Sequence, residues 1–289
     1  MDNSFIDILA DPVDGTPLTY DASTSVLTST SGNSYNVLNK KVPLLRVQQQ
    51  AEAFNYHEHY ENDAKEFDYF ADWHPVHREE NRRLHQHILA NIPATAKTVL
   101  DVGCGGAWLA KELIPQGKNV VSMDISTTNP LRAVQLVPSP NHHGLVADVF
   151  SLPIRKDSVD CIVAAEIIEH VKDPALFIAC LFNALKPGGT LIVTTPYNET
   201  LQYSLCIHCN QRTPHHAHIH SFTEEKIKIM TPASAKSATT KVFNSKLLVN
   251  LKLHLAARKL PFKAWIALDR MASAMTGKKA LRLMLVVTK

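Results

Sequence analysis

The sequence has no run of about 18 apolar residues, so it predicts no helix that spans a membrane. Residues Met1–Asp7 lack both the basic and the apolar part of a secretory signal peptide, and we therefore expect a cytoplasmic protein. Neither sign of charge dominates, because 30 basic residues stand against 27 acidic ones in 289 residues. Such a composition is typical of soluble globular proteins, and the length predicts one large domain with a small additional unit.

Cysteine is scarce, and its number is odd. Five cysteines argue against a framework of disulfides. Cys104, Cys161 and Cys180 fall in apolar segments that predict core elements, so we expect them to be reduced and buried. Cys206 and Cys209, by contrast, are spaced like a pair of metal ligands.

The small net charge of +3 conceals a charge asymmetry along the chain. Acids cluster early, at Glu58, Glu61, Asp63, Glu66, Asp68 and Asp72. Beyond residue 245 the single acid Asp269 stands against Lys246, Lys252, Arg258, Lys259, Lys263, Arg270, Lys278, Lys279, Arg282 and Lys289. This basic region is compatible with a solvated helix face, with RNA binding, or with a helix that lies on a membrane surface.

A glycine turn is the most informative local feature. An apolar segment from residue 98 ends at Asp101, and Gly103, Gly105 and Gly106 follow before a predicted helix at 109–114. A strand that passes through a glycine turn into a helix brings backbone N–H groups close to a ligand. A dinucleotide fingerprint would need one more glycine, where the chain has Trp108, and this disfavours a nicotinamide dehydrogenase.

Further strands follow at regular intervals, and several end in an acid. They are 119–124 with Asp124, 144–146 before Asp148 and Val149, 159–165 before Glu166, and 190–195 after Leu185-Lys-Pro-Gly-Gly189. Strands that alternate with helices predict an α/β fold with a doubly wound, mostly parallel sheet. Ligands bind such sheets at the carboxyl ends of the strands, where these acids lie.

Together these segments resemble class I S-adenosylmethionine-dependent methyltransferases, closely over residues 90–200. The resemblance implies a seven-stranded Rossmann-like sheet in which the last strand, 281–287, pairs antiparallel. It implies these roles: Asp101, Gly103, Cys104 and Gly105 at the methionine moiety, Asp124 and Ile125 at the ribose, Asp148 and Val149 at the adenine, and Ala165 with Glu166 at the methyl-transfer pocket. Ala107 departs from the family, which often has a third glycine there.

Glu166, Glu169 and His170 form an E-x-x-E-H segment at the start of a predicted helix, and their spacing predicts that they share one helix face. It resembles the segment of ubiquinone-pathway O-methyltransferases and small-RNA 2′-O-methyltransferases, where it can bind a divalent ion. Alternatively, the segment holds no metal and His170 is a pocket wall or a general base. Our candidate catalytic residues are His170 and Glu166, with a histidine among residues 215–220 as another candidate base.

A Cys/His-rich insert at 203–222 follows the fifth strand. Cys206 and Cys209 precede four histidines, His215, His216, His218 and His220. These residue types at this spacing predict a zinc knuckle, with His216 and His218 as candidate third and fourth ligands. The alternative is a polar loop whose histidines face the substrate pocket. Thr223 is a candidate N-cap of the next helix.

Residues 1–47 resemble the small zinc-ribbon domain that activates several RNA and protein methyltransferases. Asp11, Asp14, Thr28 and Ser31 stand where that domain has its cysteines. We therefore predict a metal-free β ribbon that serves in packing, substrate gating or partner docking. Residues 48–92 predict helices that cap the cofactor or pack as an aromatic stripe, with Phe54, Tyr56, Tyr60, Phe67, Tyr69, Phe70 and Trp73.

The resemblance thus predicts a methyltransferase domain at 93–289 that uses S-adenosylmethionine. The expected reaction is O-methylation of a hydroxyl or carboxyl group on a small molecule. RNA methylation and a non-catalytic scaffold are the alternatives.

Overall fold

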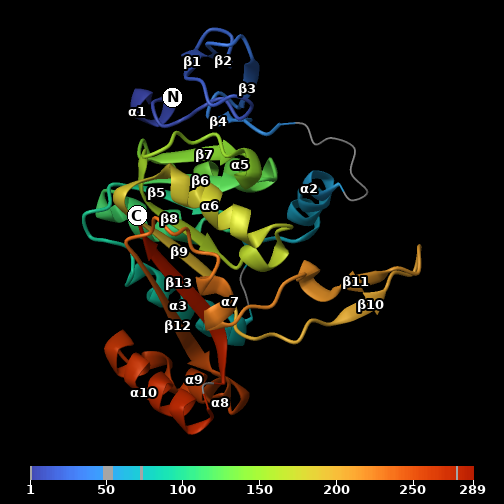
Figure 1. Cartoon of the computed structure of the whole chain (residues 1–289), viewed down its shortest axis with the longest axis vertical. Helices are drawn as coiled ribbons and strands as arrows, with labels where there is room; N and C mark the ends of the chain where they lie inside the picture. The colour runs from blue at the N-terminus through green and yellow to red at the C-terminus, as the bar shows by residue number, and fades with distance from the viewer. Residues whose placement is uncertain (1, 48–54, 72–73, 278) are drawn as a thin grey trace.

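A computed structural model describes residues 2–47, 55–71, 74–277 and 279–289. Its centre is a seven-stranded sheet (Figure 1). The strands, in spatial order, are β12 (Ser237–Ser245), β13 (Ala280–Thr288), β9 (Leu185–Pro196), β8 (Val159–Ala165), β5 (Thr98–Val102), β6 (Asn119–Asp124) and β7 (His142–Val146). Strands β9 to β7 run parallel, and β13 pairs antiparallel with both of its neighbours. The predicted doubly wound, mostly parallel sheet is confirmed.

Both faces of the sheet are buried, which explains why its strands are almost continuously apolar. On one face, Val99 and Cys161 pack with Leu84 of α3 (Pro75–Leu89) and Leu109 of α4 (Trp108–Leu113). On the other face, Leu100 packs with residues of α6 (Pro174–Ala184) and α7 (Glu224–Lys228). Helix α5 (Thr128–Leu136) lies beside β6 and β7. Thr223 caps α7 as predicted, because its side chain accepts from the Lys226 N–H.

Strand β9 begins earlier than the sequence suggested, at Leu185 rather than at Thr190. The reason lies in its register with β8. Val159 pairs with Leu185 and Cys161 pairs with Thr190, so the Lys-Pro-Gly-Gly segment bulges out between two paired positions.

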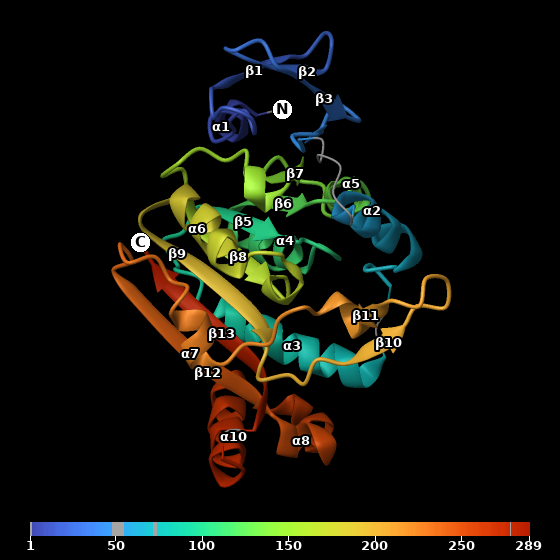
Figure 2. The same cartoon turned by 45° about the vertical axis from the view of Figure 1, so that its right-hand side comes forward.

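The N-terminal module consists of α1 (Asn3–Ile6) and a four-stranded antiparallel sheet. Its strands are β1 (Leu18–Asp21), β2 (Val26–Ser29), β3 (Ser34–Leu38) and β4 (Val42–Pro43). The module sits against β7, the edge strand of the large sheet (Figure 2). The Leu45 N–H donates to the Val146 carbonyl at 2.9 Å, and the Phe5 ring stacks on His143 at 4.4 Å. The module therefore covers an edge that would otherwise expose unpaired backbone groups.

Inside the module, hydrogen bonds join the positions that resemble a zinc ribbon. Asp11 is buried and accepts from the Val13 N–H, from Tyr35 and from Asn33, which lowers its pKa despite burial. The hydroxyls of Ser29 and Ser31 lie 2.8 Å apart. Thr28, at a position that resembles a cysteine of the zinc ribbon, is exposed, whereas the neighbouring Ser29 is buried.

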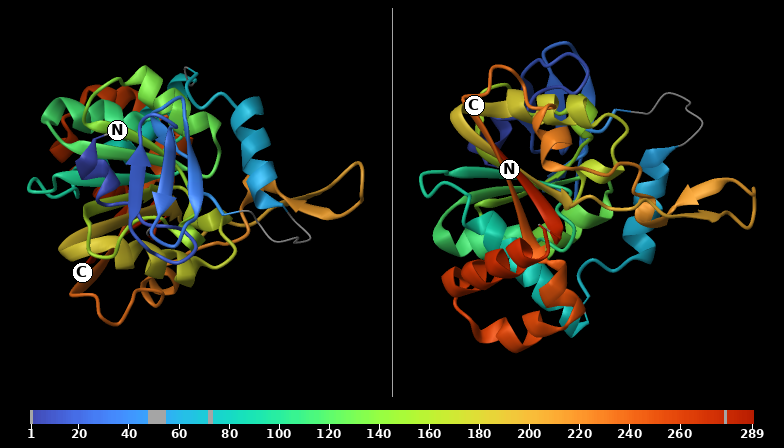
Figure 3. Two further views of the ribbon diagram at one scale, coloured as in Figure 1. Left: turned by 90° about the horizontal axis from the view of Figure 1, so that it is seen from above. Right: turned by 60° about the horizontal axis from the view of Figure 1, so that its bottom comes forward.

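Three further segments surround the sheet. Helix α2 (Tyr56–Glu66) contacts α5 and reaches Asp148, which follows β7. Phe54 and Trp73 of the predicted aromatic stripe lie outside the described residues. Strands β10 (Tyr203–Leu205) and β11 (Arg212–Pro214) form a hairpin that projects from the body (Figure 3). Helices α8 (Lys246–Asn250), α9 (Leu253–Ala256) and α10 (Phe262–Met275) connect β12 to β13. None of the described helices is long and apolar enough to cross a bilayer.

Candidate active site

The glycine turn follows β5 and places Asp101 in the interior. Asp101 is 1% exposed, and its Oδ2 has no hydrogen-bond partner among the described residues. Burial, with a smaller contribution from the nearby Asp124 carboxylate, raises the pKa of Asp101 to about 8. Gly103 has a φ of +70°, and a Cβ there would lie 2.3 Å from the Ile167 side chain. Ala107 also has a left-handed φ, 56°, which explains why glycine is common at this position.

Asp124 ends β6 and faces the same turn. It accepts from the Ser126 N–H at 2.9 Å and from the Asn129 amide at 3.1 Å. Burial raises its pKa even so. The backbone carbonyl of the next residue, Ile125, accepts from the Arg46 guanidinium at 2.5 Å. This hydrogen bond connects the predicted ribose-binding residues to the end of the N-terminal module.

Asp148 follows β7 and is contacted by helix α2. One of its oxygens accepts from the Phe150 N–H at 2.9 Å. The other is held by the Tyr56 hydroxyl and by His57 Nε2, the latter at 3.2 Å. The carboxylate predicted to bind an adenine amino group, next to Val149, is therefore engaged by the cap itself.

The segment after α2 lies directly over the glycine turn. A Cβ at Gly106 would lie 2.4 Å from the Tyr69 carbonyl oxygen, and the Tyr69 ring packs over Gly105. The Tyr69 hydroxyl donates to Asp63 at 2.5 Å. Burial and nearby acids raise the pKa of Tyr60 to about 12. Phe67 is 45% exposed, so it is not part of a continuous buried aromatic stripe.

The E-x-x-E-H segment has a different geometry from the one predicted. Only Ile168–His170 form a short 3-10 helical turn, and Glu166 precedes it with a left-handed φ of 58°. Glu166, Glu169 and His170 therefore do not share a helix face, and this prediction is wrong. Glu166 follows Ala165 at the end of β8 and pairs instead with Arg282 of β13, at 3.0 Å.

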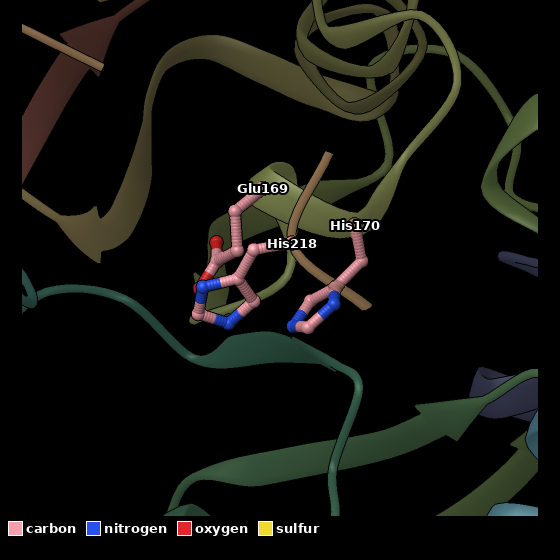
Figure 4. Close-up of side chains that lie close together, drawn as sticks. All are labelled: Glu169, His170 and His218. Atoms are coloured by element: carbon pink, nitrogen blue, oxygen red, sulfur yellow. The ribbon is translucent and has the colours of Figure 1, made fainter. Parts of the chain in front are cut away.

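Glu169 and His170 meet a histidine from the insert. Ligand atoms of Glu169, His170 and His218 all lie within 4.8 Å of one another (Figure 4). Glu169 is 1% exposed, its Oε2 accepts from Thr195 at 3.0 Å, and its Oε1 has no partner among the described residues. Burial and the neighbouring Glu166 raise its pKa well above the usual range.

Both histidines of this cluster have their Nδ1 atoms engaged by a neighbouring oxygen. His170 Nδ1 lies 3.3 Å from the Ala217 carbonyl, and His218 Nδ1 lies 2.6 Å from Glu199. Burial lowers the pKa of His170 to about 4, with a further contribution from His218, so its ring is neutral near pH 7. Imidazoles whose second ring nitrogen is held by a carbonyl or a carboxylate are a usual arrangement of metal ligands.

The insert does not assemble the predicted zinc knuckle. His218 belongs to the cluster with Glu169 and His170, and within the described part of the chain Cys206 and Cys209 join no group of three metal-ligand side chains. The set Cys206, Cys209, His216 and His218 is therefore not brought together. The two cysteines lie at the hairpin turn, where backbone N–H groups of Cys209 and His208 point at the Cys206 thiol and lower its pKa.

A pocket of about 340 Å³ adjoins this cluster. Its lining comes from the loop after β9, the histidine turn, α8 and β13, and includes Glu199, His218, Lys246 and Arg282. Acidic, basic and imidazole groups therefore face one cavity beside the cluster of Glu169, His170 and His218.

Comparison with known proteins identifies the family. The family described as "Methyltransferase domain" matches residues 73–231, more than half of the chain. The chain belongs to this methyltransferase family. Its E-x-x-E-H region lies within the matched range.

Curated relatives of the methyltransferase are also similar in sequence. It is 34% identical over 137 residues to the ubiquinone biosynthesis O-methyltransferase of Xylella fastidiosa strain 9a5c, covering 44% of this chain and 52% of that protein. It is 34% identical over 128 residues to the mitochondrial ubiquinone biosynthesis O-methyltransferase of Bos taurus, covering 40% and 33%. The chain thus spans between a third and about half of these relatives.

Solved structures show the same fold. An S-adenosylmethionine-dependent methyltransferase from Mesorhizobium loti aligns with a TM-score of 0.53 at 16% identity, over 73% of this chain and 100% of that one. A complex between the Haloferax volcanii Trm112 methyltransferase activator and a putative methyltransferase aligns with a TM-score of 0.52 at 20% identity, over 82% and 99%. The fold of the methyltransferase is therefore that of S-adenosylmethionine-dependent enzymes.

Sequence reasoning missed several residues of the methyltransferase site. Glu199 anchors His218, and it could have been found by the rule that led to Asp124, since it follows the end of a parallel strand. Tyr56 and His57 contact Asp148, which lies more than 90 residues later in the sequence. No local sequence pattern predicts such a contact.

Proposed function

We propose that this methyltransferase transfers the methyl group of S-adenosylmethionine to an oxygen of a small molecule, a hydroxyl in the first instance. The observation that carries the proposal is the position of the Glu169, His170 and His218 cluster. Glu169 and His170 follow β8 in the sheet that carries Asp101 and Asp124, and His218 also lines a pocket of about 340 Å³. The names of the curated relatives, ubiquinone biosynthesis O-methyltransferases, agree with an oxygen acceptor.

The cofactor side of the site is built for a ligand that carries positive charge. S-adenosylmethionine supplies an electrophilic methyl group when bound. Asp101 offers an unpartnered, buried carboxyl beside the glycine turn, which suits the ammonium of a methionine moiety. Asp124 offers a carboxylate for ribose hydroxyls, and Asp148 becomes available for the adenine if Tyr56 and His57 of α2 release it.

On the acceptor side, the protein must align a hydroxyl with the methyl group and remove its proton. When the cluster of Glu169, His170 and His218 holds no metal ion, the His170 ring, which is neutral near pH 7, can accept that proton. Glu166 is paired with Arg282, which lines the pocket, and it is not one of the three clustered ligand residues.

We further propose that Glu169, His170 and His218 hold a divalent ion. The donor set fits a metal ion. Glu169 Oε1 lacks a partner among the described residues, and the Nδ1 atoms of His170 and His218 are held by the Ala217 carbonyl and by Glu199. Two imidazoles and one carboxylate favour a transition metal such as Zn²⁺ over Mg²⁺, which prefers oxygen ligands. Such an ion would lower the pKa of an acceptor hydroxyl.

Zinc at Cys206 and Cys209 is a separate proposal. The N–H groups aimed at the Cys206 thiol favour its thiolate form, which is the form that binds zinc. Since His218 is engaged elsewhere, further ligands must come from the remaining insert histidines, of which His216 is our candidate.

For the N-terminal module we propose a packing role in a ribbon that needs no metal. The hydrogen bonds around Asp11 and Ser31 supply the cross-links that thiolates and zinc would otherwise supply. The module's contacts with β7 support packing over gating, because they lie at the edge of the sheet that is remote from the pocket.

Calorimetry with S-adenosylmethionine, its demethylated product and NAD tests the cofactor assignment. We expect the first two ligands to bind and NAD not to bind. Asp124→Ala should weaken binding by about 1.5–3 kcal/mol for each hydrogen bond to the charged acceptor that is lost. Glu112→Ala, an exposed acid on α4, is the matched control. Unchanged affinity in the Asp124 variant would contradict the assignment.

A further inference from the structure

The three helices between β12 and β13 form a unit of their own. We call residues 246–277 the α8–α10 unit. It extends from one end of the molecule, opposite the N-terminal module (Figure 1, Figure 3). Leu248, Trp265 and Ala272 form a small core that holds its helices together. The unit therefore has a defined outer surface that the methyl-transfer site does not use.

That surface combines positive charge with exposed aliphatic side chains. The exposed basic residues on and beside the unit are Lys252, Arg258, Lys259, Lys263, Arg270 and Lys279. The exposed large apolar residues are Leu251 at 59%, Leu253 at 45%, Leu260 at 38%, Met271 at 64% and Met275 at 80%. Single exposed apolar residues are ordinary, but a cluster of them within one small unit marks an interaction surface.

No acid offsets this charge within residues 246–277, all of which are described. The single acid there, Asp269, is 3% exposed and points inward. It accepts from the backbone N–H groups of Asn244 and Ser245, at 3.0 and 2.6 Å. The outward-facing charge of the unit is consequently positive alone.

Helix α10 carries both kinds of residue on its exposed side. Lys263 and Arg270 are seven residues apart, and Met271 and Met275 are four apart. The first spacing places Lys263 and Arg270 on one stripe, and the second places Met271 and Met275 on the neighbouring stripe, about 100° around the helix. Both stripes are exposed, whereas Trp265 and Asp269 are buried. A helix with lysine and arginine beside aliphatic residues on its outer side suits the boundary between lipid headgroups and acyl chains.

We propose that the α8–α10 unit docks the methyltransferase on an anionic lipid surface. Basic side chains would contact the headgroups, while the leucines and methionines would enter the interface. RNA fits this surface less well, because binding of unpaired bases uses exposed aromatic rings. Here Trp265 is buried and Phe262 is half-buried.

The docking surface is continuous with the candidate acceptor pocket. Lys246 is the first residue of α8 and lines that pocket, together with Leu281 and Arg282 at the start of β13. If the proposed function holds, docking places the pocket beside the lipid surface, where an amphiphilic acceptor would be concentrated. The docking itself does not depend on that function.

Vesicle sedimentation of the full chain tests the proposal. One set of vesicles is phosphatidylcholine alone, and the other is a mixture of phosphatidylcholine and phosphatidylglycerol. We expect binding to the mixture, weaker binding to phosphatidylcholine, and loss of binding as salt is raised. Lys263→Glu with Arg270→Glu should weaken binding to the mixture by about tenfold or more.

Two further variants separate the alternatives. Met271→Gln with Met275→Gln should also weaken vesicle binding, whereas binding to RNA would not need these methionines. Lys40→Glu with Lys41→Glu, on exposed lysines of the distant N-terminal module, should bind vesicles like the wild type. Calorimetry of the cofactor on each variant verifies the fold.

Several outcomes would overturn the docking proposal. They are equal binding to both vesicle types, binding unaffected by the α10 charge reversals, or binding of a single-stranded RNA oligonucleotide without binding of vesicles. Any of these results alongside intact cofactor binding would leave the proposed methyl transfer standing. Loss of cofactor binding in the wild type would count against the proposed function alone.

Discussion

Asp101 is an acid placed where water does not reach it. Its carboxyl is 1% exposed, one oxygen has no partner among the described residues, and Asp124 is nearby. The folded protein therefore disfavours the charged form of Asp101, and a pKa of about 8 expresses that cost. A cationic ligand group at this oxygen would relieve it, which links cofactor binding to stability.

Replacing Asp101 by Asn should make stability less dependent on pH. The folded pKa of Asp101 is raised above 3.8, so its contribution to stability is complete below pH 3.8 and is lost as the pH rises toward 8. Since Asn does not titrate, the free energy of unfolding of the variant should rise relative to that of the wild type by at most about 1.4 kcal/mol per pH unit across this range. Urea unfolding of the cofactor-free protein at several pH values measures the difference.

Asp157→Asn is the control for this prediction. The ion pair with Lys289 lowers the pKa of Asp157. The Asp157→Asn variant should therefore not become more stable than the wild type above pH 4. A difference between Asp101→Asn and wild type that is constant with pH would contradict the burial argument. The Asn variant should also bind S-adenosylmethionine more weakly at neutral and higher pH, where Asp101 can ionise beside the ligand's ammonium.

Residue positions at strand ends could be predicted from sequence, whereas local backbone conformation could not. Asp101, Asp124 and Asp148 lie where the alternation of strands and helices placed them, because carboxyl ends of parallel strands share one edge. Glu166 was placed wrongly, since its left-handed φ of 58° turns it out of the helix that its spacing suggested.

At the scale of elements, the insert acts by bringing one histidine to a distant segment. Backbone N–H groups of Ile219 and His220 donate to the Glu169 carbonyl at 2.9 and 3.2 Å, and this fixes the histidine turn against the E-x-x-E-H segment. Sequence spacing grouped His218 with Cys206 and Cys209, because spacing reports only local neighbours. The pairing with Glu169 spans almost 50 residues and depends on the fold.

His218→Ala should remove the divalent ion from the cluster of Glu169, His170 and His218. The variant lacks one of three metal ligands. Its affinity for the ion should fall by more than about tenfold, because replacing a residue that only hydrogen-bonds to a ligand already lowers metal affinity by about 10–100-fold. His216→Ala, a neighbouring histidine outside the cluster, should retain the metal. Metal analysis by mass spectrometry after dialysis measures both, with Cys206→Ser and Cys209→Ser present to remove any hairpin zinc.

The reverse pattern would refute the cluster as a metal site. If His216→Ala lost the ion while His218→Ala kept it, the ligands would have to be sought in the hairpin. If all of these proteins lacked metal, His170 would act on the acceptor as an unassisted base.

At the scale of the whole molecule, the N-terminal module and the large sheet share one core. Leu9 and Phe5 pack in the same cluster as Leu145 and Ile154 of the methyltransferase domain. The Ala10 N–H donates to the Pro153 carbonyl, and the Ile8 carbonyl accepts from the Arg155 N–H. The sequence predicted a separate small unit but not this interface, because its residues look like the ordinary core of the module itself.

Leu9→Ala should therefore destabilise the methyltransferase domain as well as the module. Leu9 is fully buried, and truncating such a leucine costs about 2–5 kcal/mol. The chain's three tryptophans, Trp73, Trp108 and Trp265, all lie outside residues 1–47, so tryptophan fluorescence follows the large domain alone. We expect Leu9→Ala to lower the midpoint of the thermal transition seen by fluorescence, and circular dichroism to show the same single transition.

Val13→Ala, in the same module but 64% exposed, should leave the midpoint within experimental error. A fluorescence transition that stays in place in Leu9→Ala, while circular dichroism gains an earlier step, would mean that the module unfolds independently and that its covering of β7 does not stabilise the sheet.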